Sequence, residues 1–244
     1  MTAPYSTDLL ENALLAKLRE EDRQRLAPHM VVTDLPAKTV LQQAGENVVD
    51  TWFPCGSAMA AFSVWVDEAS PAVEVGLVGS EGAIGGIVSN GNVPAFATWR
   101  VQASGRFLRL KTNALEQCKL DSLTLRHWFS RYSDCLLAQI FQTAACNATH
   151  TIIQRTAKWL LGSAARTGRV EFEMTQEQLA EMLGVGRTFV TRIVRQLRDE
   201  GVIDTRRGVF IIKDEAALRR KSCRCTTAIE DHFDTVLHGI YPVG

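Results

Sequence analysis

The 244-residue sequence lacks the marks of a membrane protein, a secreted protein and the common hydrolases. No apolar run approaches the roughly 18 residues of a membrane-spanning helix, and Met1–Pro4 opens no signal peptide. Six cysteines in a chain of this length do not suggest a secreted disulfide scaffold. The HExxH, GxSxG and P-loop patterns are absent. We therefore expect a soluble, cytoplasmic protein that is not an enzyme and has no membrane partner.

An excess of positive charge is also missing, because 27 Lys and Arg balance 27 Asp and Glu. Zero net charge argues at first against nucleic-acid binding, but the charges are unevenly distributed. Thr151–Ser222 carries 14 basic and 9 acidic residues, while the rest of the chain carries 13 basic and 18 acidic residues. An acidic part joined to a basic part is expected of a regulator that confines its DNA contact to one module.

The basic part contains the most informative segment, Thr175–Asp214. Thr175 followed by Gln178 forms a capping box, which predicts the start of a helix, and Gly184 ends that helix. A second amphipathic run ends at Gly201. Its apolar positions are Phe189, Val190, Ile193, Val194 and Leu197, and its polar positions are Arg187, Thr191, Arg192, Arg195 and Arg198. The pattern predicts a helix-turn-helix whose second helix presents arginines, as a helix entering the DNA major groove does.

A predicted β-hairpin follows the second helix. Val202–Asp204 leads into the turn Thr205–Gly208, and Val209–Ile212 has the β-branched and aromatic composition of a strand. This hairpin would be the wing of a winged helix-turn-helix, with Arg206 and Arg207 at its tip to contact phosphate. The alternative is an ordinary helical hairpin whose arginines only keep its surface solvated.

The first half of the chain has a different periodicity. Leu9–Leu26 is charged and helical, typical of a short lead-in. From Met30 to Leu110, short β-favouring segments alternate with turns rich in Gly and Asn. Many short strands at nearly even spacing predict a sandwich or a rolled barrel.

From Ser122 to His150 the pattern becomes that of one long helix. Its continuous apolar face consists of Leu125, Phe129, Tyr132, Leu136, Ile140, Thr143 and Cys146, and a partial second face consists of Trp128, Cys135 and Phe141. A helix that is apolar on more than one side should pack against its own roll and against the same helix of a second chain. We therefore expect a homodimer. The alternative is that one chain buries both faces.

The order of β-roll, long helix and winged helix resembles the Crp/Fnr family of bacterial transcription regulators over nearly the whole chain. The most specific segment is Gly186–Arg192, which is similar to the family's recognition-helix pattern. A finer likeness, to an alphaproteobacterial branch, is carried by Gln142–Asn147 with His150, Arg155–Leu161, Thr175–Ala180 and Cys223–Cys225. The resemblance implies an α+β fold in three parts. These are a cyclic-nucleotide-binding-like β-roll sensor domain (residues 1–118), a dimerisation helix (residues 119–150), and a winged helix-turn-helix DNA-binding domain with a C-terminal extension (residues 151–244).

The resemblance also implies a function. The chain would be a homodimeric, sequence-specific transcription regulator gated by an unidentified signal, with double-stranded DNA and RNA polymerase as partners. Arg187 and Arg192 match the family's recognition-helix arginines, but Thr188 replaces the usual glutamate, so the usual operator is not expected. The expected DNA-binding residues are Thr175, Gln176, Arg187, Thr188, Thr191, Arg192, Arg195, Arg206 and Arg207. A different hypothesis is a dimeric winged-helix interaction module that no longer binds DNA.

The residues with which cyclic-nucleotide-binding members of the family hold their ligand are missing. Gly86 stands where their glutamate would sit, and their Arg-Ser pair falls near Ala95–Ala97. We therefore expect no cyclic AMP binding and interpret the glycines from Gly79 to Gly86 as turn residues. The sequence identifies no other cofactor.

Cysteine and histidine residues form one further pattern. Cys146 and His150 are spaced i, i+4 on the long helix, and Cys223 and Cys225 lie near the end of the chain. If the C-terminal segment folds back, the four could hold zinc or an iron–sulfur cluster, or the thiols could sense oxidants. The interpretation we favour is that Cys146 is a small core residue, His150 is a helix-end hydrogen bonder, and Cys223 and Cys225 are a reducible pair or an inert tail, so no metal is assigned.

Overall fold

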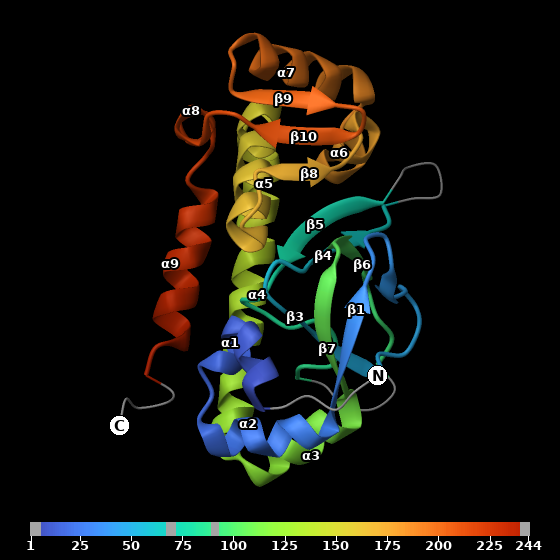
Figure 1. Cartoon of the computed structure of the whole chain (residues 1–244), viewed down its shortest axis with the longest axis vertical. Helices are drawn as coiled ribbons and strands as arrows, with labels where there is room; N and C mark the ends of the chain where they lie inside the picture. The colour runs from blue at the N-terminus through green and yellow to red at the C-terminus, as the bar shows by residue number, and fades with distance from the viewer. Residues whose placement is uncertain (1–5, 67–71, 89–92, 240–244) are drawn as a thin grey trace.

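The chain begins with a helical lead-in that is fixed to a β-roll (Figure 1). The computed structural model describes residues 6–66, 72–88 and 93–239. The lead-in is divided into η1 (Ser6–Glu11), α1 (Ala13–Ala16), α2 (Glu20–Leu26) and η2 (Ala27–His29). The buried Asn12 lies where η1 ends: its side-chain oxygen accepts from the N–H of Leu15, which caps α1. Its amide donates to the carbonyls of Pro54 and Gly82, which joins the lead-in to the roll.

Two antiparallel sheets form the roll, as the alternation of short strands and turns predicts. One sheet has the order β1 (Met30–Leu35), β7 (Gly105–Lys111), β3 (Asp50–Pro54). The other has the order β2 (Val40–Gln42), β6 (Thr98–Ala103), β4 (Met59–Val64), β5 (Val73–Val78). Phe107 is fully buried between the two sheets with Ala60 and Val101, whereas Phe53 is buried on the side of the helices, edge-on to Phe129.

The helix α3 (Thr112–Asp121) leaves the roll and leads into the predicted long helix α4 (Leu123–Thr149). The expected domain boundary at residue 118 falls inside α3. Ser122 caps α4, because its side chain accepts from the N–H of Leu125. The buried face of α4 differs from the predicted one. Trp128 and Cys135, placed on a second face by the sequence, are buried within the chain, whereas Ile140 and Phe141 are exposed.

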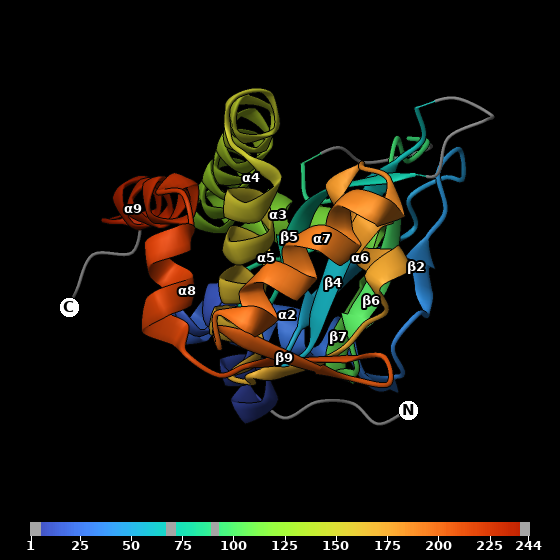
Figure 2. The ribbon, with the colours of Figure 1, turned by 90° about the horizontal axis from the view of Figure 1, so that it is seen from above.

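The reason for this difference is a C-terminal helix, α9 (Cys225–Leu237), that lies beside α4 in both views (Figures 1 and 2). Gln142 contacts Cys225 near one end of the pair, and Arg131 donates to the carbonyl of Val236 at 2.9 Å near the other. The two helices therefore run in opposite directions. The roll and α9 pack against α4 and leave a stripe of it exposed, which includes Leu137, Ile140 and Phe141.

The winged helix-turn-helix is confirmed. After α5 (Ile152–Thr167) come β8 (Glu171–Glu173), α6 (Gln176–Leu183), α7 (Arg187–Asp199), β9 (Ile203–Arg206), β10 (Val209–Ile212) and α8 (Glu215–Lys221). The strands form one sheet in the order β8-β10-β9. The predicted capping box of Thr175 and Gln178 opens α6. Gly184 ends it with a φ of 63°, in the left-handed region that favours glycine.

The winged helix rests directly on the roll. Met59 and Leu77 of the roll share one buried cluster with Leu160 of α5 and Leu179 of α6. This shared core fixes the position of the two helix-turn-helix elements relative to β5. Among the described helices, none combines the length and apolar character needed to cross a membrane.

Candidate nucleic-acid interface

The helix α7 lies at one end of the molecule (Figure 1), and the polar residues on one of its faces are exposed. The exposed residues on this face are Arg187, Thr188, Thr191, Arg192 and Arg195. The opposite face packs into the domain core through Val190, Val194 and Leu197. Two of the predicted apolar positions differ, because Phe189 is 51% exposed and Ile193 is half-buried. With Val190, Val194 and Leu197 directed into the core, the arginines lie on the side that a DNA duplex could approach.

Local contacts orient several of these side chains. The hydroxyl of Thr191 donates to Oε1 of Gln176 at 2.9 Å, which links the exposed surfaces of α6 and α7. The guanidinium of Arg192 lies 5.2 Å from the ring centroid of Phe189, at cation–π distance. Arg195 lies 3.7 Å from the carboxylate of Asp199, an exposed pair that contributes little to stability. These contacts leave the arginine head groups accessible.

The wing completes the surface. Arg206 pairs with Val209 across the hairpin, so Arg207 and Gly208 form a two-residue turn, and Gly208 has the positive φ, 77°, that such turns favour. Arg206 and Arg207 are exposed. The carbonyl of Gly208 accepts from the N–H of Met174 at 2.7 Å, which brings the wing tip beside the exposed N-cap Thr175. The start of α6, the polar face of α7 and the wing tip therefore form one surface. We call it the arginine surface.

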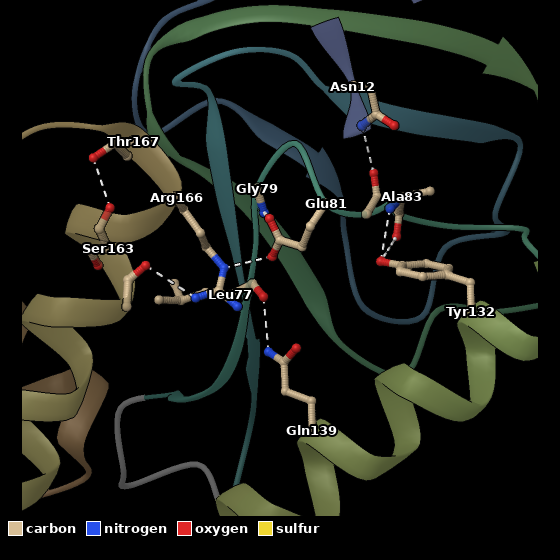
Figure 3. Close-up of polar contacts among 12 residues, drawn as sticks. Asn12, Leu77, Gly79, Glu81, Ala83, Tyr132, Gln139, Ser163, Arg166 and Thr167 are labelled. Carbon is tan, nitrogen blue, oxygen red and sulfur yellow. Dashed lines mark hydrogen bonds and ion pairs between the residues drawn. The ribbon is translucent and has the colours of Figure 1, made fainter. Parts of the chain in front are cut away.

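The turn after β5, which carries the glycine in place of the family's ligand-binding glutamate, packs closely against α4 (Figure 3). The hydroxyl of Tyr132 accepts from the N–H of Ala83 at 2.8 Å and donates to its carbonyl at 3.1 Å. A Cβ at Gly82 would lie 2.1 Å from that hydroxyl, and one at Gly86 would lie 2.4 Å from Cγ2 of Thr112. Burial raises the pKa of Tyr132 above its usual range, so the hydroxyl keeps its proton. The glycines serve close packing at this turn.

Contacts between the roll and α5 could not be identified from the sequence. Nε1 of Trp159 donates to Oε1 of Glu74 at 2.8 Å, and Nε of Arg166 donates to Oε1 of Glu81 at 2.7 Å. Each pair spans 85 residues of sequence, and no local motif links its members. Burial raises the pKa of Glu74 to about 8.

The chain folds so that Cys146, His150, Cys223 and Cys225 come together. One potential ligand atom from each of the four lies within 4.8 Å of the others. Burial raises the pKa of the Cys146 thiol to about 12, which does not suit a reactive redox cysteine. The C-terminal segment therefore folds back onto the end of α4, as the sequence analysis required for these four residues to meet.

Comparison with known proteins agrees with this architecture. Residues 154–221 match the family of Crp-like helix-turn-helix domains. Among curated proteins, no match was found. Similar solved structures include FixK2 from Bradyrhizobium japonicum, with a TM-score of 0.65 and 12% identity over 80% of this chain and 98% of that one.

Two further structures share the fold. A CRP-family transcriptional regulator from Thermus thermophilus has a TM-score of 0.65 and 17% identity, over 78% of this chain and 96% of that one. The c-di-GMP-responsive global regulator CLP from Xanthomonas campestris has a TM-score of 0.64 and 14% identity, over 80% of this chain and 99% of that one. Residues 154–221 are thus a Crp-like helix-turn-helix domain, carried on a chain that shares the fold of these solved structures.

Proposed function

We propose that the chain regulates transcription by binding specific double-stranded DNA sites as a homodimer, with α7 in the major groove and the wing on the phosphate backbone. The observation that carries this proposal is the arginine surface. Arg192 and Arg187 project from a helix whose apolar face is buried, while Arg206 and Arg207 extend the same surface. A guanidinium can pair with O6 and N7 of guanine, which is worth about 1–3 kcal/mol of discrimination. Thr188 lacks a carboxylate, so a different operator from the family's usual one is expected.

An uncovered stripe on α4 supports the homodimer. Leu137, Ile140 and Phe141 are exposed at i, i+3 and i+4 spacing, and Phe141 is 69% exposed. The described residues of the roll and of α9 leave this stripe exposed. Pairing of two such helices about a two-fold axis would bury it and would hold two α7 helices for successive major grooves, about 34 Å apart.

The contacts between the roll and the long helices support control by a signal that acts on the roll. Gln139 of α4 and Arg166 of α5 both bond to the segment from β5 to Glu81 (Figure 3). A ligand or modification that shifts this segment would change the angle of the winged helix and so shift the population between two dimer geometries. The likeness of residues 154–221 to Crp-like helix-turn-helix domains supports RNA polymerase as a further partner.

Selection from a library of random-core DNA duplexes tests the proposal. The full chain should enrich a near-palindromic site. The logarithm of its affinity for that site, measured by fluorescence anisotropy, should fall linearly with the logarithm of the salt concentration. The reason is that arginines that bind phosphates release counterions from the DNA. A chain that enriches no sequence and binds no duplex at low salt would instead be the dimeric interaction module.

A further inference from the structure

The four residues Cys146, His150, Cys223 and Cys225, which we call the Cys/His cluster, lie at a junction of three helices. Cys146 and His150 occupy the last turn of α4 and its C-cap, four residues apart and so on one side of the helix. Cys223 and Cys225 follow α8, and Cys225 is the first residue of α9. The cluster therefore joins the end of α4 to the exit from the winged helix.

The spacing of the ligand atoms fits a single tetrahedral ion. The sulfurs of Cys146 and Cys223 are 3.7 Å apart, and the sulfur of Cys225 is 3.5 Å from Nδ1 of His150. Zinc bonds of about 2.3 Å to sulfur and 2.0–2.1 Å to nitrogen place tetrahedral ligands roughly 3.8 Å and 3.5 Å apart. The sulfur–sulfur and sulfur–nitrogen separations in the protein both match these zinc-ligand spacings. An iron–sulfur cluster distributes its protein ligands over several irons, whereas these four atoms all lie within 4.8 Å of one another.

The surroundings are also those of a closed metal site. Cys146 and Cys225 are buried, and His150 and Cys223 are half-buried. Nε2 of Gln142 lies 3.2 Å from the sulfur of Cys225 and can donate to a thiolate there, as outer-shell groups of metal sites do. Cys225 also opens the 13-residue helix α9, where the helix dipole favours a thiolate.

We propose that the Cys/His cluster binds one zinc ion as a tetrahedral Cys3His site that fastens the start of α9 to the end of α4. Three thiolates and one imidazole are a ligand set that selects zinc over magnesium or calcium. Because the protein supplies all four ligands, no position is open for a substrate, and the ion acts structurally.

The position of the ion gives it a defined effect on the fold. From its first turn, α9 runs along α4, where the ring of Phe233 packs edge-on against Tyr132 with centroids 6.2 Å apart. Leu237 joins the buried core at the far end. The ion would hold α9 at its N-terminal end, at the point where α4 gives way to α5. Its removal should therefore loosen α9 before it affects the roll.

Metal analysis of the full chain tests the site. Protein purified without oxygen or strong chelators should contain one zinc per chain. Cobalt(II) added to the metal-free protein should give the intense visible bands and the sulfur-to-cobalt charge transfer of a tetrahedral thiolate site. Cys223→Ser and His150→Ala should each weaken cobalt binding by at least the roughly 10–100-fold that loss of an outer-shell group costs. Cys118→Ser is the matched control, since Cys118 is a buried cysteine outside the cluster.

Hydrogen exchange distinguishes a zinc ion that fastens α9 to α4 from an ion that binds without a structural effect. On zinc removal, exchange should increase in residues 225–237 and remain unchanged in β7. Less than one zinc per two chains with no cobalt charge transfer would overturn the proposal, and so would full cobalt affinity in Cys223→Ser. Loss of two hydrogens between Cys146 and Cys223 on mild oxidation, with no metal bound, would identify a disulfide pair instead. None of these measurements needs DNA, so the zinc site and the proposed function can fail independently.

Discussion

Arg166 donates from Nε to Oε1 of Glu81 at 2.7 Å, and the other oxygen of that carboxylate accepts from the N–H of Gly79 at 3.1 Å (Figure 3). Arg166 belongs to α5, which supports the winged helix, while Glu81 lies in the turn after β5 of the roll. Gln139 of α4 adds a neighbouring contact, donating to the carbonyl of Leu77 at 2.9 Å. Both long helices are thus bonded to one short segment of the roll.

Replacing Arg166 tests whether this contact stabilises the fold. Arg166→Ala should lower the free energy of unfolding by on the order of 1–2 kcal/mol, because the charge-assisted bond is partly shielded, with the two side chains 19% and 34% exposed. The control is Arg219→Ala. Arg219 forms a pair of the same 2.7 Å length with Glu215, but the two side chains are 69% and 55% exposed, so little loss is expected. If urea unfolding shows the same loss of stability for Arg166→Ala and Arg219→Ala, the Arg166–Glu81 contact does not stabilise the fold.

Cyclic nucleotides should not bind at the turn after β5. The N–H and carbonyl of Ala83 are occupied by Tyr132, and Gly82 leaves no space beside that hydroxyl. Isothermal titration of the full chain with cyclic AMP and with cyclic GMP should show no heat of binding at micromolar concentrations. A micromolar dissociation constant for either nucleotide would contradict this account of the turn.

The winged helix-turn-helix could be predicted from the sequence because its signals are local. The capping box at Thr175, the stop at Gly184 and the two-residue turn at Arg207 each lie within a few residues of the element they define. The polar face of α7 follows from helical periodicity, because residues on a helix that share a face also share a spacing.

The remaining features depend on contacts between distant segments. Cys146 and Cys223 are separated by 77 residues, so their proximity depends on α9 folding back. The same helix helps to decide which face of α4 is buried, and for this reason the second apolar face divides, with Trp128 buried within the chain and Phe141 exposed. Helical spacing identifies an apolar face, but it does not say which neighbour covers it.

Glu74 should make stability depend on pH. Burial raises its pKa to about 8, against the opposing effects of the Trp159 hydrogen bond and the charges of Arg166 and Lys158. An exposed glutamate has a pKa of about 4.3, so between these values the folded chain keeps a proton that the unfolded chain releases. The contribution of Glu74 to stability is therefore fully present below about pH 4.3 and is lost as pH rises to about 8.

Glu74→Gln should remove this dependence. Between pH 6 and 9, the melting temperature of the wild-type chain should fall relative to that of Glu74→Gln. The exposed Glu171 provides the control, and Glu171→Gln should follow the wild type. Parallel melting curves for wild type and Glu74→Gln across this range would show that Glu74 is ionised in the folded chain.

The stripe on α4 should hold the dimer together. Phe141→Asp places a charge in the proposed interface, opposite its own copy, and should weaken dimerisation by roughly 2 kcal/mol or more. Phe96→Asp is the matched control, because Phe96 is 85% exposed on the roll and lies outside the stripe. Analytical ultracentrifugation should show a shift toward monomer for Phe141→Asp alone. A wild-type chain that stays monomeric at micromolar concentrations would exclude this interface.

The most direct test of DNA recognition compares Arg192→Ala with Arg207→Ala on the duplex selected by the wild-type chain. Competition anisotropy should show that Arg192→Ala loses about 1–3 kcal/mol of preference for that duplex over a scrambled one, while retaining weak, salt-sensitive binding. Arg207→Ala should weaken binding to both duplexes alike. It should also reduce the slope of log affinity against log salt concentration by about one. Undiminished sequence preference in Arg192→Ala, with its helical content unchanged by circular dichroism, would contradict the assignment of α7 as the recognition helix.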